Sequence, residues 1–157
     1  MVPLAAALAF QWTVTVDPLT TAIGFTHVQV ERRLGPRASL YASPSLRLYD
    51  GILADINGPY RGLGLEVGGR AFLRPTAPEG AWLMLRGVGA RLSTTGEGPK
   101  TARWGGYTSL LAGGTFISAR GLVLSGGLGA SLFQYSVAGD GVEGLGLAAH
   151  TNLGWAF

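Results

Sequence analysis

The stretch from Gly144 to Phe157, GLGLAAHTNLGWAF, carries the clearest pattern in the chain. Its odd-numbered positions hold mainly large apolar side chains, and its even-numbered positions hold small residues together with His150 and Asn152. Successive side chains of a β-strand point to opposite faces, whereas a helix would scatter both sets around its circumference. This stretch therefore predicts a strand with one apolar face and one small, polar face.

The same period of two recurs in earlier segments, although 22–33, 81–92 and 104–118 alternate less cleanly. Most of these segments have roughly ten residues or more, which is long enough for a tilted strand to cross an outer membrane. The eight predicted strands cover 11–17, 22–33, 38–49, 61–73, 81–92, 104–118, 122–135 and 144–157.

Composition favours a membrane protein built from strands. The 157 residues are 47% hydrophobic and only 13% charged, and 26 of them are Gly. No apolar run approaches the roughly 18 residues that a transmembrane helix needs, because the longest candidate is Val2 to Phe10. An apolar chain without such a helix predicts strands that face lipid. We therefore expect an all-β, eight-stranded antiparallel up-and-down transmembrane β-barrel in a bacterial outer membrane, acting as a monomer.

The connections between the predicted strands alternate in length. Outer-membrane barrels have short periplasmic turns and longer outer loops. The short connections are 34–37, 75–80 and 118–121, and the longer ones are 50–60, 94–103 and 138–143. This order predicts that both termini are periplasmic, although the first outer connection, around Asp17 to Thr20, is short.

The chain should form a single β-barrel domain over residues 10–157. Residues 1–9, MVPLAAALA, end in Ala-Leu-Ala like a signal-peptide cleavage site, but they lack a charged n-region. They are therefore either a signal-peptide remnant or a lead-in to the first strand.

Two parts of the sequence resemble known outer-membrane proteins. Leu153, Trp155 and the terminal Phe157 resemble the C-terminal signal of bacterial outer-membrane barrels, which implies recognition by the barrel-assembly machinery. The whole chain resembles small barrels of the OmpA and OmpX type. DPLTT at 17–21 and VERRLGPRASL at 30–40 are similar to a family of uncharacterised bacterial outer-membrane barrel domains. That family implies the fold and the location but no activity.

The alternation predicts that a set of polar side chains points into the interior of the barrel. The interior of an eight-stranded barrel is just wide enough for side chains to fill, and buried charges must be paired. We expect these residues to form a plug of salt bridges and hydrogen bonds, for which Arg is well suited. The set is His27, Gln29, Glu31, Arg47, Glu66, Arg70, Arg86, His150 and Asn152.

Two positions make this pattern difficult. Trp82 and Arg86 share a face, and an outward Arg near the middle of a membrane costs about 2–4 kcal/mol. We therefore expect Arg86 to point inward, with Trp82 also inward or a bulge between them. Pro44 lacks the N–H that a strand interior needs, so it predicts a bulge or a local break.

The sequence offers little for chemistry. His27 can lie beside Ser43 or Ser45, with Glu31 on the same face, but a lipid-modifying site must face lipid at the rim rather than a plugged lumen. The chain has no Cys, and its His residues lack metal-ligand spacing. GDGVEG at 139–144 matches a nucleotide-binding pattern, but a strand rather than a helix follows it, so we expect a hairpin loop. We predict no catalytic site, cofactor or metal.

The functional expectation is an integral barrel with a closed lumen and a structural or surface-interaction role. No basic run interleaved with aromatics occurs, which argues against nucleic acid. Cationic residues near the outer rim are expected either to contact lipopolysaccharide phosphates or to be solvated; they are Arg61, Arg91, Lys100 and Arg103. The alternatives are a lipid-modifying enzyme, a narrow ion channel and a soluble lipocalin-like carrier, the last of which needs apolar residues inward and polar residues outward.

Overall fold

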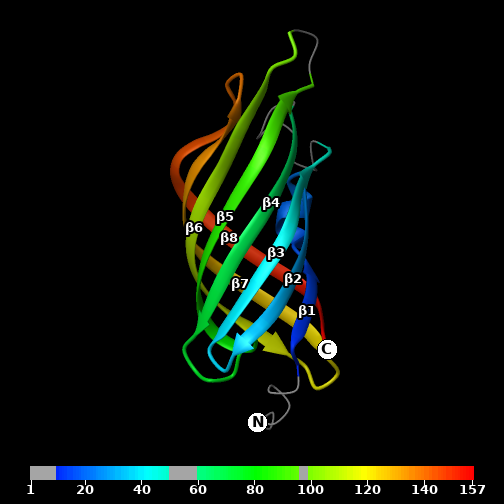
Figure 1. Ribbon diagram of the computed structural model, residues 1–157, viewed down its shortest axis with the longest axis vertical. Helices are drawn as coiled ribbons and strands as arrows, with labels where there is room; N and C mark the ends of the chain where they lie inside the picture. Colours follow the sequence, from blue (N-terminus) through cyan, green and yellow to red (C-terminus); the bar gives the residue numbers. More distant parts are fainter. Residues whose placement is uncertain (1–9, 50–59, 96–98) are drawn as a thin grey trace.

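The computed structural model describes residues 10–49, 60–95 and 99–157. Within them, eight antiparallel strands follow one another around a closed barrel (Figure 1). The strands are β1 (Trp12–Val16), β2 (Phe25–Gly35), β3 (Ala38–Arg47), β4 (Tyr60–Phe72), β5 (Gly80–Thr94), β6 (Ala102–Ile117), β7 (Leu122–Val137) and β8 (Asp140–Ala156), with a short helix, α2 (Pro18–Ala22), after β1. The all-β barrel of eight antiparallel strands expected from the alternation is confirmed.

The first and last strands close the barrel. They pair from Thr13 opposite Ala156 to Val16 opposite Leu153. Beyond this ladder, Trp12 and Phe157 exchange two backbone hydrogen bonds of 2.9 Å. The start of β1 and Phe157 therefore lie at the same end, here called the terminal end, and the β7–β8 hairpin lies at the other, the distal end (Figure 1).

Two connections differ from the sequence predictions. The loop expected at 138–143 is wrong, because Val137 pairs with Asp140 across a two-residue turn. Ala138 and Gly139 both have positive φ, 53° and 93°, as the tightest hairpins require. The first outer connection contains α2, whose start is capped by the Asp17 carboxylate accepting from the Leu19 and Thr20 amides. Three predicted segments lie outside the described residues in whole or in part: residues 1–9, residues 50–59 of the loop predicted at 50–60, and residues 96–98 of the one predicted at 94–103. Tyr60 already belongs to β4.

Pro44 interrupts a ladder without causing a bulge. On the β4 side it pairs with Leu65 in an unbroken register. On the β2 side, His27 opposite Ser45 and Val30 opposite Ala42 keep one register, and the pairs between them are missing. The β2–β3 irregularity lies instead between Arg33 and Gly35. The expected break is therefore present, because proline cannot donate to the ladder, but the register is conserved.

The two faces of the barrel wall have the reverse polarity of a soluble protein, with apolar side chains outside and polar side chains inside. Most large hydrophobic side chains along the strands point outward, with Leu147 94%, Leu145 81% and Leu128 72% exposed. Polar and charged residues, among them Glu66 and Arg70, are buried inside. Among the described residues, no helix is long and apolar enough to cross a membrane.

Inward-facing glycines provide space for aromatic rings. Trp82, Gly113, Gly127 and His150 are consecutive partners across four strands. A Cβ atom at Gly113 or Gly127 would lie 2.4 or 2.5 Å from the Trp82 ring, so the indole lies across both glycines. It meets the His150 ring edge-on at 5.9 Å and donates from Nε1 to Thr115 Oγ1 at 2.9 Å. Both Trp82 and Arg86 thus point inward, which confirms the first of the two arrangements considered for them.

Replacing Gly113 should therefore damage packing in a way that replacing its neighbour does not. Gly113→Ala places a methyl group against Trp82 and the Gly126 carbonyl, 2.3 Å away, and we expect a loss of about 1–3 kcal/mol in unfolding free energy. Gly114→Ala is the matched control, because its nearest contact is an ordinary 3.9 Å. Equal unfolding free energies for the two variants in chemical denaturation would contradict this packing.

Candidate functional site

The buried polar network inside the barrel is the candidate site. The structure places all of the polar residues expected inside in the interior, each 6% exposed or less: His27, Gln29, Glu31, Arg47, Glu66, Arg70, Arg86, His150 and Asn152. They form two clusters centred on buried carboxylates and a third group around one guanidinium.

The first cluster surrounds Glu31. Its carboxylate accepts from Arg70 Nη1 at 2.6 Å and from Thr13 Oγ1 at 3.3 Å, and it also accepts from Ser39. Arg70 Nη2 lies 2.6 Å from His150 Nε2. Since a guanidinium only donates, this His150 nitrogen must accept, which places the proton of a neutral ring on Nδ1. The cluster therefore links β1, β2, β3, β4 and β8.

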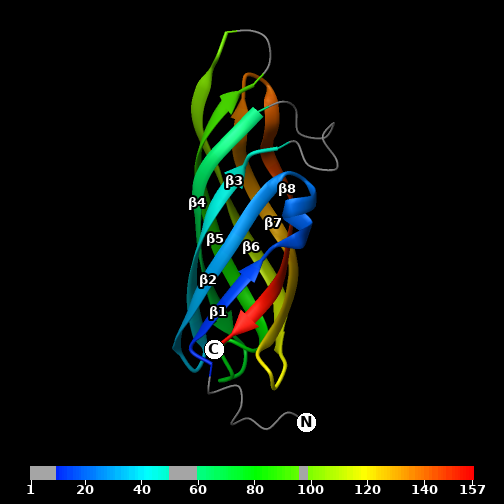
Figure 2. The ribbon, with the colours of Figure 1, turned by 90° about the vertical axis from the view of Figure 1, so that its right-hand side faces the viewer.

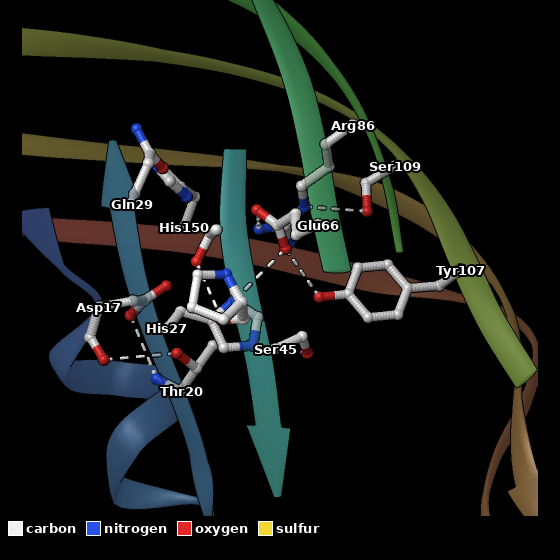
Figure 3. Close-up of polar contacts among 12 residues, drawn as sticks. Asp17, Thr20, His27, Gln29, Ser45, Glu66, Arg86, Tyr107, Ser109 and His150 are labelled. Carbon is white, nitrogen blue, oxygen red and sulfur yellow. Dashed lines mark hydrogen bonds and ion pairs between the residues drawn. The ribbon is translucent and has the colours of Figure 1, made fainter. Parts of the chain in front are cut away.

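The second cluster surrounds Glu66 (Figure 3). Tyr41 Oη donates to its Oε1 at 2.8 Å, and Tyr107 Oη donates to its Oε2 at 3.1 Å. His27 Nδ1 lies 3.5 Å from Oε2, and Arg86 Nη1 lies 3.8 Å from Oε1. Four side chains from β2, β3, β5 and β6 thus converge on one buried carboxylate. This is the coordination that a buried anion needs to offset its lost hydration.

The third group lies nearer the distal end around Arg47. Its guanidinium stacks over the Tyr60 ring at 4.3 Å and the Phe25 ring at 5.1 Å. It donates to the backbone carbonyls of Tyr60 and Ile23 at 3.2 and 3.1 Å. Arg47 therefore connects the end of β3 to β4 and to the residue that follows α2.

Ser45, His27 and Glu66 have the order of a nucleophile, a base and an acid. Ser45 Oγ lies 3.1 Å from His27 Nε2, and Glu66 contacts the other ring nitrogen. The sequence placed His27 beside Ser43 or Ser45 with Glu31 as the acid; the contact is with Ser45, and the acid is Glu66 instead, because Glu31 is held by Arg70. Ser45 is fully buried, however, and the distal cavity of about 290 Å³ that reaches His27 is not lined by Ser45. Within the described residues, this cavity therefore does not reach the Ser45 hydroxyl.

The other residues singled out in the sequence lie on the outer surface or at the rim. Leu153, Trp155 and Phe157 are 44%, 53% and 62% exposed on the outer face. Arg91, Lys100 and Arg103 are exposed and Arg61 is half-buried, at the strand ends and connections of the distal end. Arg103 lies 3.4 Å from Glu143 in an exposed ion pair. Within the described ranges, no group of three His, Asp or Glu residues could hold a metal ion.

Sequence reasoning did not identify Tyr41 and Tyr107 as partners of Glu66, and it missed the role of Asp17. Tyr107 lies on β6, where alternation was weak, and the contact needs the register of four strands. Asp17 accepts from Thr151 Oγ1 at 2.6 Å as well as capping α2. The Asp-Pro pair at a helix start was the available signal, because Asp favours the N-cap and Pro the first helical position.

Comparisons with known proteins add no relative: no protein-family model, curated protein or solved structure matches the chain.

The Glu31–Arg70 pair should contribute strongly to stability. Glu31→Leu or Arg70→Met leaves one buried charge without its partner, and we expect each to lower the unfolding free energy by about 3–5 kcal/mol. The double variant should lose less than the sum of the two, because it removes both charges. Arg103→Gln at the exposed pair is the control and should cost less than about 1 kcal/mol. Additive losses at Glu31 and Arg70 would show that the two side chains do not interact.

Ser45 should not react as a nucleophile. Treatment of the folded protein with a fluorophosphonate probe, followed by mass spectrometry, should leave Ser45 unmodified because its hydroxyl is enclosed. A Ser45 adduct that disappears in His27→Gln would overturn this interpretation and identify a working hydrolase site.

Proposed function

We propose that this chain is an integral outer-membrane β-barrel with a closed, side-chain-filled lumen and a structural or surface-interaction role. The observation that carries the proposal is the inversion of the two faces. Leucines such as Leu63, Leu128 and Leu147 are 65%, 72% and 94% exposed, while whole clusters of charge lie inside. Water would penalise such a surface and hydrocarbon would not, so a lipid environment fits both faces.

Exposed aromatic side chains at both ends of the barrel support the same orientation. Trp12, Phe116, Trp155 and Phe157 belong to strand ends at the terminal end, and Tyr49 and Trp104 lie towards the distal end; all are between 39% and 69% exposed. Aromatic girdles at two levels are typical of barrels whose ends meet lipid headgroups. We infer that the terminal end is periplasmic, because the longest connection between strands, from Arg47 to Tyr60, lies at the distal end.

The other functions considered from the sequence fit less well. A lipocalin-like carrier needs apolar residues inside and polar residues outside, the reverse of this arrangement. A narrow channel needs a continuous aqueous path, but Glu31, Arg70 and Trp82 occupy the lumen and are 3% exposed or less. A lipid-modifying enzyme needs an accessible nucleophile, and Ser45 is enclosed.

The proposed partners follow from this location. The barrel-assembly machinery would recognise the outward Leu153, Trp155 and Phe157. Outer-membrane lipid would cover the leucines, and lipopolysaccharide phosphates would meet the distal Arg and Lys residues. The resemblance to OmpA-type barrels and to uncharacterised outer-membrane barrel domains remains part of the proposal, and so does the monomeric state.

A charge on the outer face should oppose insertion according to its depth. Leu128 lies in the middle of β7 and points outward, so Leu128→Arg should make folding into phosphatidylcholine vesicles less favourable by about 2–4 kcal/mol. Gln134→Arg, outward on the same strand but near its distal end, is the matched control and should cost about 0–1 kcal/mol. Equal, small costs at the two positions would contradict a membrane-spanning orientation.

The distal cations should retain lipopolysaccharide. Purification of Arg91→Gln/Arg103→Gln from outer membranes should yield less copurifying lipopolysaccharide than the unmodified protein, because two phosphate-binding charges are removed. Arg74→Gln/Arg120→Gln removes equal charge at the terminal end and should leave retention unchanged. The same retention in both double variants would reject the distal Arg residues as lipid contacts.

A further inference from the structure

The barrel wall is incomplete beside β8. Strand β1 has five residues, whereas β8 has 17, and their pairing stops at Val16 opposite Leu153. The chain then leaves the sheet as α2, which lies beside β8 (Figure 2). In the described part of the chain, no strand pairs with β8 between Asp140 and Asn152 on this side.

Among the described residues, side chains make hydrogen bonds to the backbone of this free edge only at its part nearer the terminal end. Because Trp12 and Phe157 exchange both backbone hydrogen bonds, the odd-numbered residues of β8 direct their N–H and C=O groups towards β1. The Thr151 amide donates to Asp17 Oδ2 at 3.5 Å, and the Ala149 carbonyl accepts from Arg86 Nη2 at 3.2 Å. Further towards the distal end, α2 and β8 border an opening instead of a ladder.

The distal cavity of about 290 Å³ passes through this opening. Leu147, Ala148 and Ala149 all line it. Successive residues of a strand face opposite sides of the wall, so a cavity that contacts all three lies against the free edge. Its lining extends from Leu147, which is 94% exposed on the outer face, to His27 in the lumen. The cavity is therefore a lateral passage between the outer face and the lumen.

The lining of the passage selects for hydrocarbon. Its walls include Phe25, Tyr60 and Tyr135 from the barrel and Leu19 and Ile23 from the region of α2. Ligand sites are typically concave and mainly apolar, with volumes of roughly 300–1,000 Å³. This cavity, at about 290 Å³, lies just below that range and has room for no more than a single chain.

The two nitrogen-bearing side chains at the inner end, His27 and Arg86, already have partners. His27 contacts Ser45 and Glu66. Arg86 contacts Glu66, and it donates to Ser109 Oγ at 3.2 Å and to the free edge of β8 (Figure 3). A charged headgroup would have to displace these contacts beside the Glu66 carboxylate, whereas an alkyl chain would not.

We infer that this passage binds one acyl chain of a lipid from the surrounding membrane. The inference rests on the proposed membrane orientation, in which the outer end at Leu147 opens to hydrocarbon rather than to water. The chain enters between α2 and β8 and ends against the aromatic walls above His27. Burial of apolar surface against Phe25 and Tyr135 stabilises it there.

The test is proton NMR of the full chain in nanodiscs of dimyristoylphosphatidylcholine. Intermolecular Overhauser effects, which require direct proximity, are measured from acyl methylene protons to the Phe25 ring in the passage and to the Leu132 methyl groups on the outer face. We expect cross peaks to both residues. Ala149→Phe narrows the opening and should abolish the Phe25 cross peaks while retaining those of Leu132. Ala112→Phe, on the exposed face of β6 and away from the passage, should retain both.

The outcomes separate the inference from the proposal beneath it. Cross peaks to Leu132 without any to Phe25 in the unmodified protein would overturn the acyl-chain site and leave the membrane barrel intact. Phe25 cross peaks that persist in Ala149→Phe would overturn the lateral route. Absence of cross peaks to Leu132 would reject the membrane orientation and the inference with it.

Discussion

The structure depends on the need to satisfy two carboxylates buried in a narrow lumen. Glu31 and Glu66 are each 2% exposed, and together their partners come from β1 to β6. Each carboxylate costs several kcal/mol to bury and recovers this only when surrounding donors are correctly placed. A shift of one strand by one residue would send its donors to the outer face. The two carboxylates therefore fix strand register as well as filling the interior.

Glycine and aromatic side chains complete this arrangement. The lumen contains rings that cross from one strand to another, as Trp82 does over Gly113 and Gly127, and Tyr41 does over Gly68. A Cβ atom at any of these glycines would overlap the ring. These three glycines thus make room for large side chains inside a barrel of only eight strands. Most of the leucines, which would form the core of a soluble domain, occupy the outer face instead.

The sequence contained much of the fold and less of the site. Alternation predicted most of the strands and inward side chains, because a strand has a strict period of two, and the cost of an outward Arg decided the side of Arg86. The register of the hairpin even placed His27 beside either Ser43 or Ser45, and the contact is with Ser45. It could not identify Glu66 as the carboxylate on His27, since strands that are not sequential come together only through the tilt of the closed barrel. The end of β1 agrees with the predicted strand at 11–17 to within one residue, but the helix α2 was not predicted, because it is a local feature set by Asp17 and Pro18.

The central claim is that the outward leucines require a lipid-like surrounding. The most direct measurement is electrophoretic heat modifiability: the chain is refolded with and without detergent micelles, and circular dichroism and gel mobility are recorded before and after boiling. We expect β-rich dichroism, and a shift in gel mobility on boiling, only when detergent is present. A stable β-fold in plain buffer, with no shift on boiling, would contradict it.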